Sequence, residues 1–163
     1  GAGPSLERLK EVPEGTSIAA DGATSFFIDN GLVPDIIVTD LDGKIEDLLL
    51  ANRKGSIVVI HAHGDNIPAL KYAREFNAPL GTTQAEPFGR LYNFGGFMDG
   101  DRSVFLARHF GAKKICLFGM DTGSENSRYS FSKNPKVTRK KLVWTTRLIR
   151  YLRERHNNIV KMG

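Results

Sequence analysis

Short apolar runs alternate along the chain with stretches in which apolar residues recur at helical spacing. The apolar runs cover residues 17–20, 35–39, 56–61, 79–82 and 114–118. Helical spacing follows at residues 44–53, after Asn66, at 102–110 and at 137–155. This alternation is typical of βα units around a mostly parallel sheet. We therefore predict one α/β domain over residues 1–163, a Rossmann-like three-layer sandwich with about five or six strands and helices on both faces.

Polar residues mark the ends of several of these elements. Asn66 is expected to cap a helix lined by Leu70 and Phe76, and Asp101 is expected to cap the helix at 102–110. Residues 120–135 are rich in Ser, Asn and Gly and are expected to form a mobile loop. Long loops in compact domains are often lids over a binding site.

The first residues, G-A-G-P-S-L-E-R-L, have the composition of a glycine-rich turn that leads into a helix. Gly1 and Gly3 would let backbone N–H groups approach a phosphate at the start of that helix, where Ser5 also lies. A flexible terminal turn is the alternative. A turn of this kind normally follows a strand, so we expect the full-length protein to have residues before Gly1.

Acidic or imidazole side chains directly follow four of the predicted strands. They are Asp21, Asp40, Asp42, His61, His63, Asp65 and Asp121. The carboxyl ends of parallel strands share one edge of a sheet, and ligands of open α/β sheets bind outside that edge. Converging carboxylates repel one another unless a cation lies among them, which favours Mg²⁺. Each aspartate alone also fits a helix cap or a turn, and the D-x-D pair at 40 and 42 is the strongest signal.

Two further segments carry ligand-type residues. His61 and His63 are too isolated from cysteine to favour a zinc site, so a polar role near a substrate is expected, with a general-base role left open. The segment N-F-G-G-F-M-D-G-D-R, residues 93–102, combines glycines that allow close approach with rings that can stack on a flat ligand and with charges suited to metal and phosphate. A glycine-rich turn before a capped helix is the alternative.

The charge of the chain is unevenly distributed. The formal net charge is +5, and residues 133–163 hold ten lysines and arginines against one acid, Glu154. A phosphate-rich ligand, nucleic acid or a solvated helix face would each explain this bias. Nucleic acid is not expected, because no basic surface interleaved with aromatic residues is present.

The lack of a visible targeting signal and the presence of a single cysteine favour the cytoplasm. The longest apolar runs are too short to span a bilayer, and the N-terminus lacks the apolar stretch of a signal peptide. The single cysteine, Cys116, lies in an apolar run and is expected to be buried. A homodimer is compatible with this organisation.

Several of these motifs together closely resemble the archaeal 6-hydroxymethyl-7,8-dihydropterin pyrophosphokinases, in order from Gly1 to about Leu142. They are G-A-G-P-S, A-A-D-G-A, P-D-I-I-V-T-D-L-D-G, H-A-H-G-D-N, N-F-G-G-F-M-D-G-D-R and F-G-M-D. The chain is also distantly similar to thiamin pyrophosphokinase. Where that enzyme has an acidic D-x-T-D segment this chain has H-G-D, so only Asp65 has a counterpart and thiamin is disfavoured as the substrate.

The resemblance implies transfer of a pyrophosphoryl group from ATP to the hydroxymethyl oxygen of the pterin, with Mg²⁺ as cofactor and AMP as the other product. This reaction would serve folate or methanopterin synthesis on a thiamin-pyrophosphokinase-like core. The partners would be the small molecules ATP and a pterin. The alternatives are a thiamin-type pyrophosphokinase, a glycosyltransferase related to flagellin-modifying enzymes, and a nucleotide-sensing module without turnover.

The resemblance also implies roles for particular residues. The implied metal ligands are Asp21, Asp40 and Asp42. The implied catalytic residues are Asp40, Asp42, His63, Asp65 and Arg102. ATP binding falls to Gly1, Gly3, Ser5, Lys140 and Lys141. Pterin binding falls to Asn66, Asn93, Phe97, Asp99 and Asp101.

Overall fold

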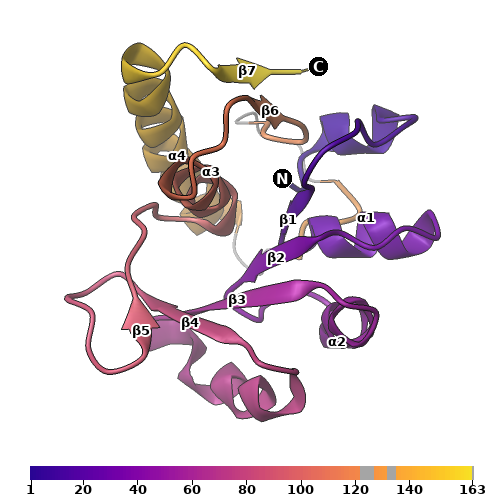
Figure 1. The fold of residues 1–163 in the computed structure, drawn as a ribbon, viewed down its shortest axis with the longest axis vertical. Helices are drawn as coiled ribbons and strands as arrows, with labels where there is room; N and C mark the ends of the chain where they lie inside the picture. The colour runs from indigo at the N-terminus through magenta and orange to yellow at the C-terminus, as the bar shows by residue number, and fades with distance from the viewer. Residues whose placement is uncertain (122–126, 132–134, 163) are drawn as a thin grey trace.

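A five-stranded parallel sheet forms the centre of the fold in the computed structural model, which describes residues 1–121, 127–131 and 135–162 (Figure 1). Its strands follow the order of the chain and are β1 (Ile18–Ala20), β2 (Ile36–Thr39), β3 (Ile57–Ala62), β4 (Leu80–Thr83) and β5 (Leu91–Tyr92). Every neighbouring pair is parallel. The carboxyl ends of β1 and β2 therefore lie side by side, as the alternating pattern predicts.

Helices cover both faces of this sheet. The helical elements are the 3₁₀ segments η1 (Pro4–Arg8) and η2 (Gly64–Glu75) and the α-helices α1 (Ala23–Asp29), α2 (Ile45–Arg53), α3 (Asp99–His109) and α4 (Pro135–Arg155). Ile37 and Val58 point to the face that α2 covers, while their neighbours Val38 and Val59 pack against Leu106 of α3 on the other face. Successive strand residues point to opposite faces, so these apolar runs bury both sides of the sheet and make the predicted three-layer sandwich.

A second, smaller sheet lies apart from the first. Strand β6 (Ile115–Leu117) pairs in parallel with β7 (Ile159–Lys161), and α3 and α4 pack against them through Val104 and Leu152. The prediction that all the apolar runs share one sheet is wrong for β6. The prediction of a buried Cys116 is also wrong, because Ile115 and Leu117 point to the helices and Cys116 faces the opposite, uncovered side.

Two helix starts differ from the predictions. Helix α3 begins at Asp99 after Met98, and Asp101 lies inside its first turn, where its carboxylate reaches back to the backbone N–H of Met98. Asn66 likewise lies inside η2, whose N-cap is His63, and Pro68 favours the tighter 3₁₀ turns. Helix α1 and the short strands β5 and β7 were not predicted. No helix among the described residues is long and apolar enough to cross a membrane.

Candidate active site

Three carboxylates meet at the carboxyl ends of β1 and β2. Asp21 directly follows β1, and Asp40 and Asp42 follow β2; one oxygen of each lies within 4.8 Å of the others. The structure thus brings together the three residues predicted as metal ligands. Asp65 is exposed at the start of η2 and is not a member of this group, although it was expected at the same edge.

The backbone around these carboxylates takes conformations that only tertiary contacts can maintain. Asp21 and Leu41 have positive φ values of 42° and 68°, which cost about 1–2 kcal/mol for a residue with a side chain. Leu41 is buried in the core between Asp40 and Asp42, and this burial offsets the cost. The Thr39 hydroxyl accepts from the Leu41 N–H at 2.8 Å and donates to Asp21 at 2.5 Å, so it joins the two strand ends.

Gly43 allows the closest approach in this group. A Cβ at this position would lie 2.5 Å from Oδ2 of Asp21, well inside van der Waals contact. The backbone N–H of Gly43 instead donates to Oδ1 of Asp21 at 3.3 Å. The glycine that follows the D-x-D pair is therefore required by the packing of Asp21.

The electrostatics of the cluster favour a cation. Burial raises the pKa of Asp21 and of Asp42 above the usual value, and repulsion from the neighbouring carboxylates adds to the rise. Burial, followed by Asp40, Asp21 and Asp42, also raises the pKa of Asp99. A donor set made only of carboxylate oxygens matches the ligand preference of Mg²⁺ and other hard divalent cations. The residues present therefore fit the predicted magnesium ion.

His63 and Asn66 hold Asp40 in place. Nε2 of His63 lies 3.2 Å from Oδ2 of Asp40, while its Nδ1 accepts from the Asp65 N–H at 3.3 Å. A neutral His63 therefore carries its proton on Nε2 and donates it to Asp40. The buried Asn66 amide donates to the carbonyls of Asp40 and His61, both at 2.7 Å, and its oxygen accepts from the His63 N–H at 2.9 Å. Asn66 thus links the ends of β2 and β3.

Arg102 is enclosed by the turn that precedes α3. It is 1% exposed, and its guanidinium donates to the carbonyls of Gly95 at 3.1 Å and Gly96 at 3.2 Å. Gly96 has φ 89°, and a Cβ there would lie 2.5 Å from the Cα of Arg102. The guanidinium therefore holds this glycine-rich turn in place through these hydrogen bonds.

His61 continues this network into the sheet. The Thr82 hydroxyl donates to the Ile60 carbonyl at 3.2 Å, so it accepts the proton of Nδ1 of His61 at 3.2 Å. The remaining lone pair on Nε2 of His61 then faces the Arg102 guanidinium at 3.2 Å. Burial, and then the charge of Arg102, lower the pKa of His61 to about 4, so the imidazole is neutral. This structural role of His61 was not predicted from the sequence.

Asp101 accepts three hydrogen bonds from within the protein. Its side chain is fully buried and accepts from the Phe97 N–H at 2.6 Å and the Met98 N–H at 2.9 Å. The Thr145 hydroxyl of α4 donates a third hydrogen bond at 2.8 Å. Asp101 therefore fixes the turn 97–98 and attaches α4 to α3.

Other members of the 93–102 segment remain accessible. Phe97 is 41% exposed, whereas Phe94 is engaged in ring contacts with Tyr92 at 5.8 Å and His109 at 4.8 Å. Asn93 is exposed and donates to the Ala85 carbonyl at 3.1 Å. Of the two rings considered for stacking, Phe97 is the one left available.

The N-terminal glycine turn packs against the segment after β6. The amino group of Gly1 donates to the Phe118 carbonyl at 2.7 Å, and the Gly3 N–H donates to the Gly119 carbonyl at 2.8 Å. The Ser5 N–H donates to Asp121 at 2.7 Å. These backbone donors are engaged within the protein, and Asp121 anchors η1 instead of joining the other aspartates. The predicted ATP-binding roles of Gly1, Gly3 and Ser5 stay predictions.

The predicted lid and its lysines lie only partly within the described residues. Residues 122–126 and 132–134 of the loop lie outside the described residues. The described part is anchored, because Tyr129 is 2% exposed and its ring lies 5.7 Å from that of Phe26. Lys140 and Lys141 lie near the start of α4, and Lys141 precedes Thr145 by one helical turn. Lys141 is therefore on the face of α4 that contacts the start of α3.

The fold and the site define an open parallel α/β protein with three carboxylates at the carboxyl edge of its sheet, which is the edge where such folds bind their ligands. The chain belongs to the 6-hydroxymethylpterin diphosphokinase MptE-like family, whose sequence model matches residues 1–127. This match confirms the resemblance seen in the motifs.

Three relatives carry the name 6-hydroxymethyl-7,8-dihydropterin pyrophosphokinase. The protein from Methanothermobacter thermautotrophicus is 49% identical over 98% of this chain and 74% of its own length. The protein from Methanocaldococcus jannaschii is 43% identical over 95% of this chain and 73% of its own length. The protein from Pyrococcus furiosus is 56% identical over 74% of this chain and 53% of its own length.

Proposed function

We propose that this protein transfers the pyrophosphoryl group of ATP to the hydroxymethyl oxygen of 6-hydroxymethyl-7,8-dihydropterin and releases AMP. The observation that carries the proposal is the group of Asp21, Asp40 and Asp42 at the carboxyl edge of the sheet. Membership in the diphosphokinase family and the names of three relatives support the choice of reaction and acceptor.

The reaction makes charge neutralisation the main task of the site. The hydroxymethyl oxygen attacks the β-phosphorus of ATP and releases its proton to a base or to water. The bond from that phosphorus to the α-phosphate oxygen breaks, and AMP leaves with the negative charge. Catalysis of such a transfer consists largely of positioning and electrostatic stabilisation. A magnesium ion held by the three aspartates would supply the positive charge. His63 acts as a positioning residue, because its Nε2 proton fixes the orientation of Asp40.

The geometry divides the predicted pterin ligands into two groups. Phe97 presents an exposed ring for stacking, and Asn93, Asp65 and Asp99 have polar groups suited to the edge of a pterin. Asn66 and Asp101 are buried and use their side chains for hydrogen bonds within the protein. Asn93 also bonds to Ala85 and Gly95, but its side chain is exposed. We therefore assign pterin recognition to the first group and a supporting role to Asn66 and Asp101.

The two lysines of α4 also differ. Lys141 shares a helix face with Thr145, which is bonded to Asp101 at the start of α3, while Lys140 is exposed on another face. We assign contact with the ATP phosphates to Lys141. Arg102 already donates to three carbonyls and to His61, so its part in the reaction is to hold the turn 95–97.

An assay of AMP formation tests the proposed reaction. The protein is incubated with ATP, Mg²⁺ and either the pterin, thiamin or no acceptor, and AMP is measured by chromatography. We expect AMP only with the pterin. Thiamin-dependent AMP, transfer from a nucleotide sugar, or tight ATP binding without AMP would instead support the three alternative functions.

A further inference from the structure

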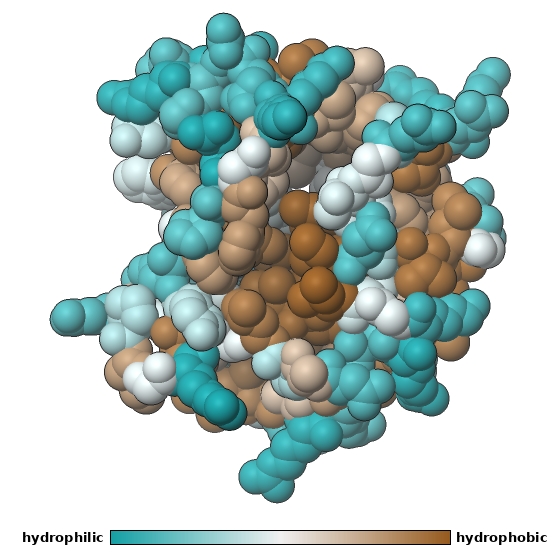
Figure 2. Space-filling model, viewed as in Figure 1, coloured by the Kyte–Doolittle hydropathy of each residue, from teal (hydrophilic) through white to brown (hydrophobic). Residues whose placement is uncertain are grey.

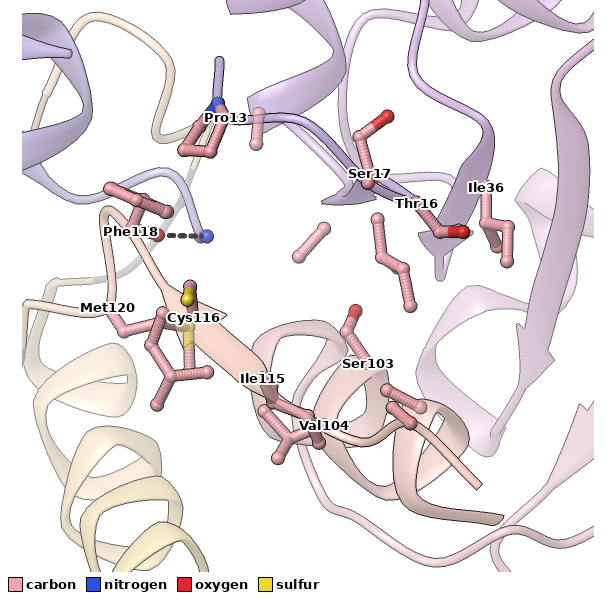
Figure 3. Close-up of a pocket in the computed structure, with 18 of the residues that line it drawn as sticks. Pro13, Thr16, Ser17, Ile36, Ser103, Val104, Ile115, Cys116, Phe118 and Met120 are labelled. Atoms are coloured by element: carbon pink, nitrogen blue, oxygen red, sulfur yellow. Dashed lines mark hydrogen bonds between the residues drawn. The ribbon is translucent and has the colours of Figure 1, made fainter. Parts of the chain in front are cut away.

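An apolar cleft between β1 and β6 is not suited to the charged substrates of the proposed reaction. It has a volume of about 730 Å³, and the hollow of the space-filling view exposes hydrophobic side chains (Figure 2). The close-up shows Ile36, Val104, Ile115 and Cys116 around the space (Figure 3). The three clustered carboxylates do not line this cleft, and phosphate groups would lose their hydration against its apolar walls. We therefore expect the substrate rings at exposed aromatic side chains beside the carboxylates.

Residues 127–131 form a strap that is anchored on the N-terminal turn and on α1. The Ser127 hydroxyl donates to the Ala2 carbonyl at 2.5 Å and accepts from the Tyr129 N–H at 3.0 Å. The Tyr129 hydroxyl donates to Asp29, the last residue of α1, at 3.1 Å. These hydrogen bonds fix the position of the strap relative to α1.

Gly22, the residue after Asp21, allows the strap to approach the carboxylates. A Cβ at Gly22 would collide with the carbonyl oxygen of Tyr129 and would lie 3.1 Å from Cδ2 of Phe131. The φ of Gly22 is −58°, which any residue adopts, so the close approach of the strap is the reason for a glycine here. The ring of Phe131 therefore packs beside the residue that follows Asp21, and it is still 37% exposed.

Phe131 and Phe97 lie toward opposite faces of the sheet. Ala19 of β1 pairs with Ile37 of β2, and both point to the face that α1 and α2 cover. Phe131 packs at the start of α1 and so lies toward this face. Phe97 lies just before α3, which covers the other face. The three carboxylates are at the sheet edge between these two exposed rings.

The chemistry of the proposed reaction requires two ring sites with this relation. In a phosphoryl transfer the attacking oxygen and the leaving oxygen lie roughly in line with the phosphorus between them. The pterin carries the attacking oxygen and AMP carries the leaving oxygen, so their rings extend from opposite sides of the β-phosphate. A β-phosphate bound by a metal at the carboxylates would therefore have one exposed ring on each side.

We propose that Phe131 stacks on the adenine of ATP, on the opposite side of the carboxylates from the pterin at Phe97. This inference rests on the proposed function and adds a residue that recognises the nucleotide. Asn93 and Asp99 lie on the segment of Phe97 and suit the polar edge of a pterin. Phe131 precedes Lys141, which we assign to the ATP phosphates, by ten positions. Stacking between a base and an exposed aromatic ring is a general mode of nucleotide binding.

Two ligands separate the ring site from the phosphate site. Inorganic tripolyphosphate has the phosphate chain of ATP without adenosine. Binding of each ligand in the presence of Mg²⁺ is measured by isothermal titration calorimetry for the wild type, Phe131→Ala, Phe131→Trp and Phe97→Ala. Phe110→Ala is the matched control, because Phe110 is 69% exposed at the far end of α3. The KM for the pterin is measured on the same proteins at saturating ATP.

We expect Phe131→Ala to raise the Kd for ATP by about five- to a hundredfold and to leave the Kd for tripolyphosphate unchanged. Phe131→Trp should restore ATP binding, because it restores a flat ring. Phe97→Ala should raise the KM for the pterin and leave the Kd for ATP unchanged. Phe110→Ala should bind both ligands like the wild type.

Three results would overturn the proposal. They are an unchanged Kd for ATP in Phe131→Ala, an equal loss of ATP and tripolyphosphate binding in that variant, and an exchange of the effects of Phe131→Ala and Phe97→Ala. The expected loss of ATP binding in Phe131→Ala, without any pterin-dependent AMP formation by the wild type, would support the adenine site and overturn the proposed function alone.

Discussion

Two D-x-D segments of this chain have the same acids at the same spacing and different surroundings. Asp40 and Asp42 lie at the open carboxyl edge of the sheet, where their charges add to that of Asp21. Asp99 and Asp101 begin α3, where Asp101 is fully buried and accepts three hydrogen bonds. The first segment leaves charge for a ligand to neutralise, whereas Asp101 in the second uses its charge to build the fold. The burial of an aspartate and the number of protein hydrogen-bond donors around it therefore separate a binding aspartate from a structural one.

The largest effect is expected for Asp42→Asn, which removes one charge and keeps the shape. We expect kcat/KM for AMP formation to fall by at least about a hundredfold, because the metal-binding set loses a charged ligand. The melting temperature should not fall, because the substitution relieves repulsion among the carboxylates. Glu46→Gln, at an exposed position of α2, is the matched control and should leave activity unchanged. Near-normal turnover of Asp42→Asn at limiting Mg²⁺ would remove this residue from the metal site.

Asp101→Asn is expected to act on stability. The new amide NH₂ must face either the Phe97 N–H or the Met98 N–H, so a donor meets a donor in a buried place. We expect the free energy of unfolding, measured in urea, to fall by about 2–4 kcal/mol. Asp99→Asn tests the same motif and should cost little stability, because burial and repulsion already disfavour its charge. Similar losses for the two variants would contradict the distinction between them.

The two lysines of α4 provide the next test. Lys141→Ala should remove one charge-assisted contact with ATP, about 1.5–3 kcal/mol, and raise KM for ATP by about ten- to a hundredfold. Lys140→Ala removes the same charge from the neighbouring, exposed position and should have no such effect. Steady-state kinetics at saturating pterin measures both. A larger effect for Lys140 would show that α4 meets the nucleotide with another face.

The smallest expected effect is a pH-dependent shift in thermal stability. The pKa of Asp42 is raised to about 8 by burial and by its two neighbours, so the folded protein binds more protons than the unfolded chain from about pH 4 to pH 8. In EDTA, stability should therefore fall as pH rises through this window. Mg²⁺ should raise the melting temperature by a few degrees at pH 8 and less at pH 5. Equal stabilisation at both pH values would show that Mg²⁺ does not compete with these protons.

The apolar pattern predicts the core of this molecule well. The runs at 35–39 and 56–61 become adjacent buried strands, and the acids after them meet at one edge, because parallel strands end on the same side of a sheet. The motifs around these acids also predict the diphosphokinase family, which the comparisons confirm. These features depend on residues close together in the chain.

Contacts between distant residues decided the rest. Asp101 is structural because the hydroxyl of Thr145, 44 positions later, donates a hydrogen bond to it. Arg102 points inward because its guanidinium donates to Nε2 of His61, 41 positions earlier. Cys116 is exposed because the facing edge of β1 stands across an apolar cleft instead of pairing with β6. The sequence by itself determined that the segments of β1 to β4 and β6 form strands and which of them are followed by acids, since both follow from local period and chain direction. Only the tertiary structure decided which charges are satisfied, because hydrogen-bond partners and burial come from segments that no local pattern connects.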